Sequence, residues 1–182
     1  MIAFMFPLLI LINIISTSAF LKLNRLYTKR NFQLYESNPH RESFSNSNRF
    51  HLAIEAGELS ETIKFYTDIL GCMTDMEEKG KWIDIDFWGN ELTLHQSKPR
   101  QRDCLDRHRH HVDMGDVMVP HLGIHLKWDD YIRVKSNVKA AVGFLDDPYI
   151  RFEGTEYQQE TFFCEDPNFN VLEIKSMMKD KA

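Results

Sequence analysis

Two short stretches that lie 70 residues apart, Phe50-His51-Leu52-Ala53-Ile54 and Pro120-His121-Leu122-Gly123-Ile124, begin two segments of the same pattern. In each stretch apolar residues alternate with polar or small ones, as in a half-buried strand. Apolar residues at helical spacing follow, and then several short strand-like runs. A repeat of this length indicates two copies of one supersecondary unit. The sequence therefore predicts an α+β protein made of two βαβββ modules.

Both predicted helices carry apolar residues three or four positions apart and stop at a glycine. These apolar positions are Leu59, Ile63, Tyr66 and Leu70 in the first helix, and Tyr131, Val134, Val138 and Ala141 in the second. Asp129 is expected to cap the second helix. The predicted strands that follow are 82–87 and 91–95 in the first half and 149–153, 159–164 and 171–175 in the second. The polar, His-rich stretch between the halves is expected to form a linker loop.

The first 49 residues differ in composition from the rest of the chain. Residues 1–21 carry no charge, and small residues at 16–19 follow the apolar run, as in a secretory signal peptide. Residues 20–35 contain basic but no acidic side chains, as in a transit peptide. The expected organisation is a signal peptide at 1–19, a transit peptide-like presequence at 20–49 and a folded domain at 50–178, with modules 50–96 and 119–177 and the linker 97–118.

The junction of the two leader segments, Ser18-Ala19-Phe20, resembles the bipartite presequence of proteins imported into the complex plastids of diatoms and related algae. The resemblance implies a location in such a plastid. Simple secretion or an uncleaved anchor is the alternative interpretation.

The composition bounds the partners of the chain. Residues 50–182 carry 16 basic and 25 acidic side chains, a net charge of −9, which argues against a nucleic acid as partner. The apolar run at 2–15 is shorter than the roughly 20 residues of a membrane span, so no stable span is expected in the mature protein. Three cysteines are too few and of odd number for a disulfide framework. A small-molecule partner is expected, and pairing of two chains is left open.

Strand alternation predicts which side chains share a face. The polar faces carry His51, Ala53 and Glu55 in the first strand, His121, Gly123 and His125 in its counterpart, and Glu173 and Lys175 in the last strand. The opposite, apolar faces need the helices for cover. An unpartnered buried carboxylate or imidazole costs several kcal/mol, so the polar faces must look at water or at each other. If the modules pair across a pseudo-twofold axis, His51, His121 and Glu173 converge in one cavity.

Two imidazoles and one carboxylate on a concave sheet are typical of a facial triad that binds a divalent metal ion and keeps open positions for substrate or water. Fe(II) is the first candidate for this ligand set, and Mn, Ni and Zn are also possible.

At these residues the chain resembles the vicinal oxygen chelate superfamily, the group of glyoxalases, bleomycin-resistance proteins and extradiol dioxygenases. The resemblance covers nearly all of 50–177. Its motifs are Phe50-His51-Leu52-Ala53, Phe65-Tyr66, Ile69-Leu70-Gly71, Pro120-His121-Leu122-Gly123 and Asp166-Pro167-Asn168-Phe169-Asn170-Val171-Leu172-Glu173. It implies that the modules pair into a curved mixed sheet with the site in its concave cavity. It also implies His51, His121 and Glu173 as metal ligands.

Several residues depart from the family pattern. Thr93 stands where glyoxalase I places a second glutamate ligand, and His95 lies two residues further on the same face. Phe163 stands near the expected tyrosine of an extradiol dioxygenase, and no histidine follows His125, which argues against ring cleavage. Phe169 replaces the usual glycine of the last turn, so a slightly different turn is expected there.

Three function classes remain open. The first is a metal-dependent lyase, isomerase or dioxygenase that binds vicinal oxygens of a small substrate. In it, His125 and His95 are the candidates for proton transfer, and Lys175 and Arg151 are candidates for binding an anionic substrate. The second class is a metal-free binding protein of the bleomycin-resistance type. The third is a structural or assembly role in the plastid without a ligand.

Overall fold

The computed structural model describes residues 48–105, 107–112 and 115–178. The chain from Arg49 onward forms one compact unit. The predicted signal peptide and almost all of the predicted transit peptide lie outside the described residues, so plastid targeting stays a prediction. In the part of the chain that is described, no helix is both long enough and apolar enough to cross a membrane.

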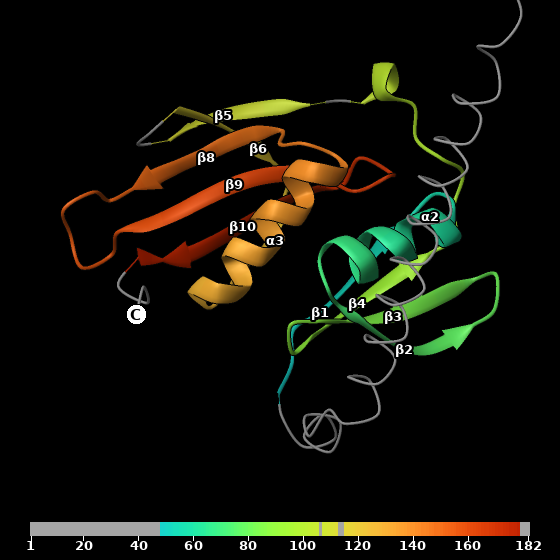
Figure 1. The fold of residues 1–182 in the computed structure, drawn as a ribbon. Coiled ribbons are helices and arrows are strands. Elements are labelled where there is room, and N and C mark those ends of the chain that lie inside the picture. The colour runs from blue at the N-terminus through green and yellow to red at the C-terminus, as the bar shows by residue number, and fades with distance from the viewer. Residues whose placement is uncertain (1–47, 106, 113–114, 179–182) are drawn as a thin grey trace, which may run out of the picture. The chain divides into compact units, whose positions relative to one another are not determined.

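Each half of the compact unit folds as one βαβββ module (Figure 1). The first module consists of β1 (His51–Glu55), α2 (Leu59–Lys64) with the π-helical turn η2 (Phe65–Ile69), β2 (Met73–Glu78), β3 (Trp82–Phe87) and β4 (Asn90–His95). The second consists of β7 (Leu122–His125), α3 (Trp128–Ala141), β8 (Asp146–Arg151), β9 (Gln159–Glu165) and β10 (Val171–Met177). The predicted α+β class with two βαβββ modules is confirmed.

Each module makes its own four-stranded mixed sheet, in the order β1-β4-β3-β2 in the first and β7-β10-β9-β8 in the second. The register repeats as well. Ala53 opposes Thr93 across the parallel pair β1 and β4, and Gly123 opposes Glu173 across β7 and β10. Thr93 and Glu173 therefore occupy the same position in the two modules. Glycine suits position 123 because a Cβ atom there would lie 2.4 Å from the Glu173 carbonyl oxygen.

One local prediction is wrong. Helix α3 begins at Trp128 behind the N-cap Lys127, which makes no side-chain cap bond, so Asp129 lies in the first turn and is not the cap. Its charge still suits the positive end of the helix dipole. Phe169 has a left-handed backbone (φ 63°), a conformation that glycine adopts more easily than phenylalanine.

The stretch 97–118, expected to be a loop, contains the 3-10 turn η3 (Arg102–Cys104) and a two-stranded sheet of β5 (His108–Val112) and β6 (Gly115–Val119). The prediction failed because tertiary contacts outweigh the polar composition. Val117 and Met118 pack against Phe163 and Val171 of the second module. The Arg109 guanidinium bonds to Asp146 at 2.7 Å, which neutralises part of the basic stretch.

One hydrophobic core joins the two modules. Tyr66 and Leu70 of the first helix and Tyr131 and Phe162 of the second module are fully or almost fully buried in it. The Asn137 amide of α3 donates to the Ile69 carbonyl at 3.1 Å, so the two helical layers also share a hydrogen bond.

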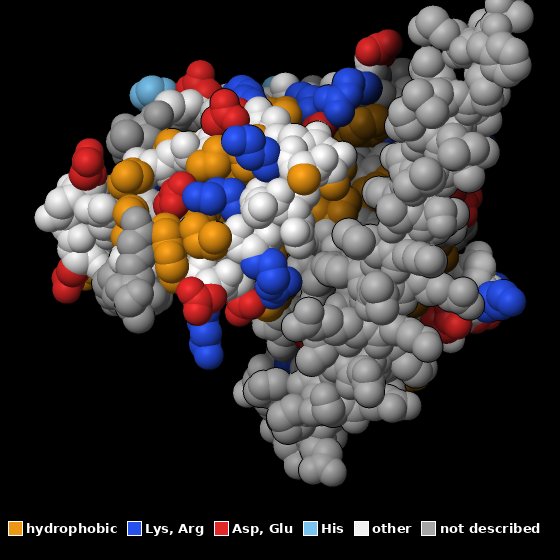
Figure 2. Space-filling view, viewed as in Figure 1, with side chains coloured by type: hydrophobic (Ala, Val, Ile, Leu, Met, Phe, Trp, Pro, Cys, Tyr) orange, Lys and Arg blue, Asp and Glu red, His pale blue; other side chains and the backbone are white. Residues whose placement is uncertain are grey.

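On the face shown in Figure 2, acidic and basic side chains lie intermixed with exposed hydrophobic ones. A polyanion would meet both attractive and repulsive charges there.

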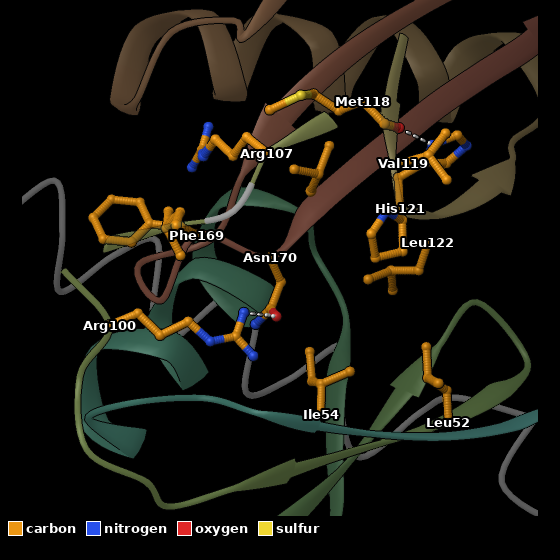
Figure 3. A pocket seen from close by; sticks show the side chains of 13 residues that line it. Leu52, Ile54, Arg100, Arg107, Met118, Val119, His121, Leu122, Phe169 and Asn170 are labelled. Atoms are coloured by element: carbon orange, nitrogen blue, oxygen red, sulfur yellow. Dashed lines mark hydrogen bonds between the residues drawn. The ribbon is translucent and has the colours of Figure 1, made fainter. Parts of the chain in front are cut away.

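The arrangement of the modules directs the two faces of β1. Figure 3 shows the side chains of Leu52 and Ile54 pointing toward His121 and Leu122 at the start of β7. Because successive residues of a strand point to opposite faces, His51 points the other way. The His51 side chain therefore lies on the face of β1 opposite to the one that meets His121 of the same chain.

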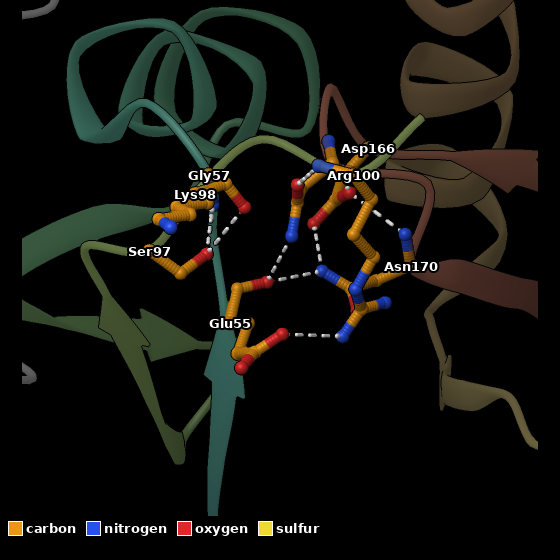
Figure 4. Close-up of polar contacts among 8 residues, drawn as sticks. Glu55, Gly57, Ser97, Lys98, Arg100, Asp166 and Asn170 are labelled. Atoms are coloured by element: carbon orange, nitrogen blue, oxygen red, sulfur yellow. Dashed lines mark hydrogen bonds and ion pairs between the residues drawn. The ribbon is translucent and has the colours of Figure 1, made fainter. Parts of the chain in front are cut away.

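A polar junction ties the last turn of the second module to the end of β1 (Figure 4). The amides of Asn168 and Asn170 donate to the Glu55 carbonyl at 2.8 and 2.9 Å. Asn168 Oδ1 accepts the backbone N–H of Arg100 at 2.9 Å, and the buried Tyr66 hydroxyl donates to Asp166 at 3.3 Å. The turn at 166–170 thus connects the two modules through hydrogen bonds.

We predict that Asn168→Ala lowers the free energy of unfolding by about 1–3 kcal/mol, because it removes two hydrogen bonds and leaves the Arg100 N–H without its acceptor. Urea unfolding followed by tryptophan fluorescence measures the change. Asn90→Ala is the matched control, since the Asn90 amide donates to the Phe87 carbonyl of its own module at 3.4 Å. Equal losses in the two variants would contradict a junction between modules.

Candidate functional site

The face of the second sheet that carries Glu173 and Lys175 is called the inner face of the second module, and the corresponding face with His51 is the inner face of the first. The inner face of the second module holds a carboxylate that is almost completely buried. Glu173 on β10 is 4% exposed. The Thr161 hydroxyl donates to its Oε1 at 3.0 Å, and the Lys175 ammonium donates to its Oε2 at 2.8 Å. His121 Nε2 lies 3.5 Å from Oε2, and Arg151 Nη1 lies 4.0 Å from Oε1. These five residues are called the Glu173 cluster below.

The strand register assembles this cluster. Glu173 and Lys175 are two residues apart on β10 and so share a face. Thr161 on β9 opposes Lys175, and Gly123 on β7 opposes Glu173 without a side chain of its own. Arg151 reaches the carboxylate from the end of β8.

His121 is oriented by bonds on both sides of its ring. Its Nδ1 lies 2.6 Å from the Met118 carbonyl oxygen, which can only accept, so Nδ1 carries a proton. Its Nε2 faces the Glu173 carboxylate. The hydrogen bond to Glu173, against the opposing effect of burial, raises the pKa of His121. The ring also packs edge-to-face on Phe163. These contacts favour an imidazolium at His121.

The surroundings move the pKa values of the neighbouring groups in different directions. Burial alone would raise the pKa of Glu173, but hydrogen bonds from His121, Lys175 and Thr161 lower it from 4.5 to about 2. Burial and the positive charge of Lys175 lower the pKa of His125, which opposes Lys175 across β7 and β10. His125 is thus held neutral beside an ionised carboxylate.

The inner face of the first module carries a second imidazole–carboxylate pair. His51 Nδ1 lies 2.6 Å from Glu91 Oε1, and the His51 side chain is 57% exposed. Thr93, in the position equivalent to Glu173, donates to Asp84 at 2.6 Å. His95 is exposed at the end of β4, opposite Glu55.

The structure brings together only part of the predicted site. His121, Glu173, Lys175 and Arg151 lie in one cluster with His125 beside it, whereas His51 and His95 lie on the first module. Within residues 48–105, 107–112 and 115–178 of one chain, no three His, Cys, Asp or Glu side chains are grouped closely enough to hold a metal ion. The assignment of His51, His121 and Glu173 as ligands stays a prediction.

Two cavities lie where the modules meet, with volumes of about 290 and 520 Å³. Leu52, His121 and Leu122 line both of them. The smaller cavity, drawn in Figure 3, also has Arg100, Arg107 and Phe169 in its wall. The larger one is also lined by Phe50, Phe87 and Glu91. His121 therefore connects the Glu173 cluster to both cavities.

The cluster does not fit a divalent metal ion as it is arranged in one chain. His121 does fit, because a ring N–H bonded to a carbonyl is the usual support of a ligating imidazole. Glu173 does not, because the Lys175 ammonium already occupies Oε2 and Arg151 approaches Oε1. Two cations beside the carboxylate repel a third.

Sequence reasoning missed two residues of these faces. Glu91 lies on a predicted strand, but the register that places it opposite His51 depends on parallel pairing between strands 40 residues apart. Thr161 was an ordinary strand residue in the sequence, and its bond to Glu173 follows from the antiparallel register of β9 and β10. Strand alternation could have placed both on inner faces without naming their partners.

Comparisons with known proteins find similar solved structures. No family profile matches the chain, and no curated protein matches it. Among solved structures, a glyoxalase/bleomycin resistance protein/dioxygenase from Alicyclobacillus acidocaldarius is 32% identical with a TM-score of 0.55, over 74% of this chain and 95% of that one. A lactoylglutathione lyase from Agrobacterium tumefaciens is 18% identical with a TM-score of 0.50, over 71% and 93% of the two chains. The second likeness shows the fold alone.

We predict that Glu173→Gln destabilises the protein at neutral pH by on the order of 3 kcal/mol and that this loss shrinks in acid. The pKa of Glu173 is lower in the folded chain, so its stabilising effect is fully present above about pH 4.5 and disappears as the pH falls toward 2. Urea unfolding of both proteins between pH 7 and pH 2.5, in roughly half-unit steps, measures the difference. A difference that grows in acid would contradict the prediction. Glu160→Gln, which breaks a 2.8 Å pair with Lys135, is the control and should cost less.

Proposed function

Because this chain belongs to the glyoxalase/bleomycin resistance protein/dioxygenase family, we propose that it binds a small molecule at the inner face of its second module and carries out acid–base chemistry there. One observation carries the proposal. His121 contacts the Glu173 carboxylate and also lines both cavities between the modules. The cavity volumes suit a small molecule, and the walls combine apolar side chains with a few polar groups, as ligand sites do.

The proposed chemistry follows from groups whose pKa values are moved apart. Glu173 has a pKa of about 2, so it stays ionised and orients His121. The raised pKa of His121 favours a proton at Nε2, which the ring can donate to a ligand. His125, with its lowered pKa, is neutral and can accept a proton. The donor lies just before β7 and the acceptor ends it, and a proton-transfer reaction on a small substrate needs such a donor and acceptor.

We further propose that two chains form a homodimer in which the inner face of one chain's first module covers the second module of its partner. The faces have complementary charge. The first carries Glu55, Asp84, Asp86 and Glu91, and the second carries Lys175, Arg151, His121 and His125 around Glu173. Among the described strands, β1 and β7 each lie at the edge of their sheet, and an edge strand can pair with a further strand. Such a dimer would bring His51 of one chain near His121 of the other.

Metal-dependent lyase, isomerase or dioxygenase chemistry is the second candidate function, with Fe(II) as the first candidate ion and Mn, Ni or Zn as others. The observation in its favour is the Nδ1–H bond of His121 to Met118, which leaves Nε2 available as a ligand. An ion held by His121 and Glu173 would act as a Lewis acid. It would first require that Lys175 leave Glu173.

The homodimer predicts a sedimenting mass of twice the subunit mass at low salt. Because opposite charges meet in the proposed interface, raising the salt from about 0.05 to about 1 M should weaken the dimer at least tenfold. Sedimentation equilibrium at several protein concentrations measures the dissociation constant. A monomer at low salt and micromolar concentration would contradict the proposed dimer.

The acid–base proposal predicts the kinetics of two histidine variants. Methylglyoxal–glutathione hemithioacetal, catechols and short 2-oxo acids form the substrate panel. On any substrate that the wild type converts, His125→Ala should lower kcat by roughly 10²–10⁴ with little change in bound ligand. His111→Ala is the control, because His111 on β5 is exposed and pairs with the exposed Asp116 on β6. His95→Ala tests the other candidate in the same way. Unchanged kcat in His125→Ala would refute the assigned role.

A further inference from the structure

We propose that Glu173 is not a metal ligand but the anchor of an oxyanion-binding subsite, in which Lys175 and Arg151 bind a carboxylate or phosphate group of the ligand. The inference rests on the proposed function and deepens it, because it names the chemical class of the molecule that the second module takes. It starts from the disagreement between the family's metal site and the groups that surround Glu173 in this chain.

The first step concerns the oxygens of Glu173. Oε1 accepts the Thr161 hydroxyl, and Oε2 accepts the Lys175 ammonium at 2.8 Å. A metal ion binds a carboxylate oxygen at about 2.0–2.6 Å, in the space where the ammonium lies. The ammonium would have to move, and the ion would still face Arg151, 4.0 Å from Oε1. The Glu173 carboxylate therefore pairs with cationic side chains in place of a metal ion.

The second step concerns charge. The Glu173 cluster contains two permanent cations and one carboxylate, so its charge is +1 with a neutral His121 and +2 with a protonated one. The side chains of Lys175 and Arg151 are only 20% and 18% exposed. In such a partly buried site a positive charge attracts an anion more strongly than it would in water. Within one chain, a bound oxyanion would lower the positive charge of the cluster, and a divalent cation would raise it.

The third step concerns geometry. The Lys175 ammonium has three N–H donors, and one of them bonds to Glu173 Oε2. Lys175 and Arg151 approach different oxygens of this carboxylate, Oε2 and Oε1, so they lie on its two sides. Lys175 also lies opposite His125, the proposed base. An oxyanion bound by Lys175 would place the rest of a small acid within reach of His125.

Calorimetric titrations of the purified protein with pyruvate and with inorganic phosphate, in a low-salt buffer free of both, test the anion; Mn²⁺ binding followed by electron paramagnetic resonance tests the metal. We expect the wild type to bind one of the two anions at one per chain and to bind no stoichiometric Mn²⁺. Lys175→Met should weaken the anion at least tenfold and strengthen Mn²⁺ at least tenfold, because Glu173 Oε2 becomes free. Tighter binding of pyruvate would identify the anion as a carboxylate, and tighter binding of inorganic phosphate would identify it as a phosphate.

Two further variants keep the test decisive. Lys135→Met is the matched control, since Lys135 pairs with Glu160 at the same 2.8 Å distance and similar exposure, and it should behave as the wild type with both probes. Arg151→Gln retains the Lys175–Glu173 pair, so it should weaken the anion without a gain in Mn²⁺. It reports on the site even where Lys175→Met does not fold.

Stoichiometric Mn²⁺ on the wild type that is lost in Glu173→Gln would overturn the inference. Binding of neither anion to the wild type would also overturn it. That second result would leave the proposed function standing if the panel activity and the His125→Ala effect were observed. If the wild type converts no substrate of the panel but binds an anion, the acid–base proposal is refuted and the subsite is supported.

Discussion

Burial of one apolar face of each four-stranded sheet against the helices is the constraint on which the rest of the structure depends. Leu92 and Leu94 in the first sheet and Leu172 and Ile174 in the second are at most 1% exposed in the common core. Since neighbouring residues of a strand point to opposite faces, burial of these side chains fixes the face to which each polar side chain points. The inner faces, and with them the site, are therefore a consequence of how the core packs.

The repeat allows the chemistry of the two inner faces to be compared at equal positions. His51 and His121 begin the two modules, but the carboxylate that each meets comes from a different place. Glu91 directly opposes His51, whereas His121 meets Glu173, the residue equivalent to Thr93. The first pair is exposed and contributes little to stability. The second is buried, so its carboxylate needs several donors, and Lys175 and Arg151 become part of the site.

Much of this fold could be predicted from the sequence, because strand alternation and helical spacing are local properties of the chain. The repeat of the two stretches at His51 and His121 gave both modules, and alternation placed Glu173 and Lys175 on one face. The pairing partners could not be predicted in the same way. Glu91 opposite His51 depends on contacts between distant strands, and the β5–β6 sheet forms because Val117 and Met118 pack on the second module.

The same limit explains the site. Motif spacing indicates which residue types stand at ligand positions, but the chemistry of a carboxylate is decided by the groups that contact it. Glu173 has the identity and the position expected of a metal ligand, yet its two oxygens are taken by Thr161 and Lys175. Lys175 was visible in the sequence as a neighbour on the same face. Its 2.8 Å ion pair with Glu173 forms where burial removes water as an alternative partner, and this pair is the basis of the anion subsite that we propose.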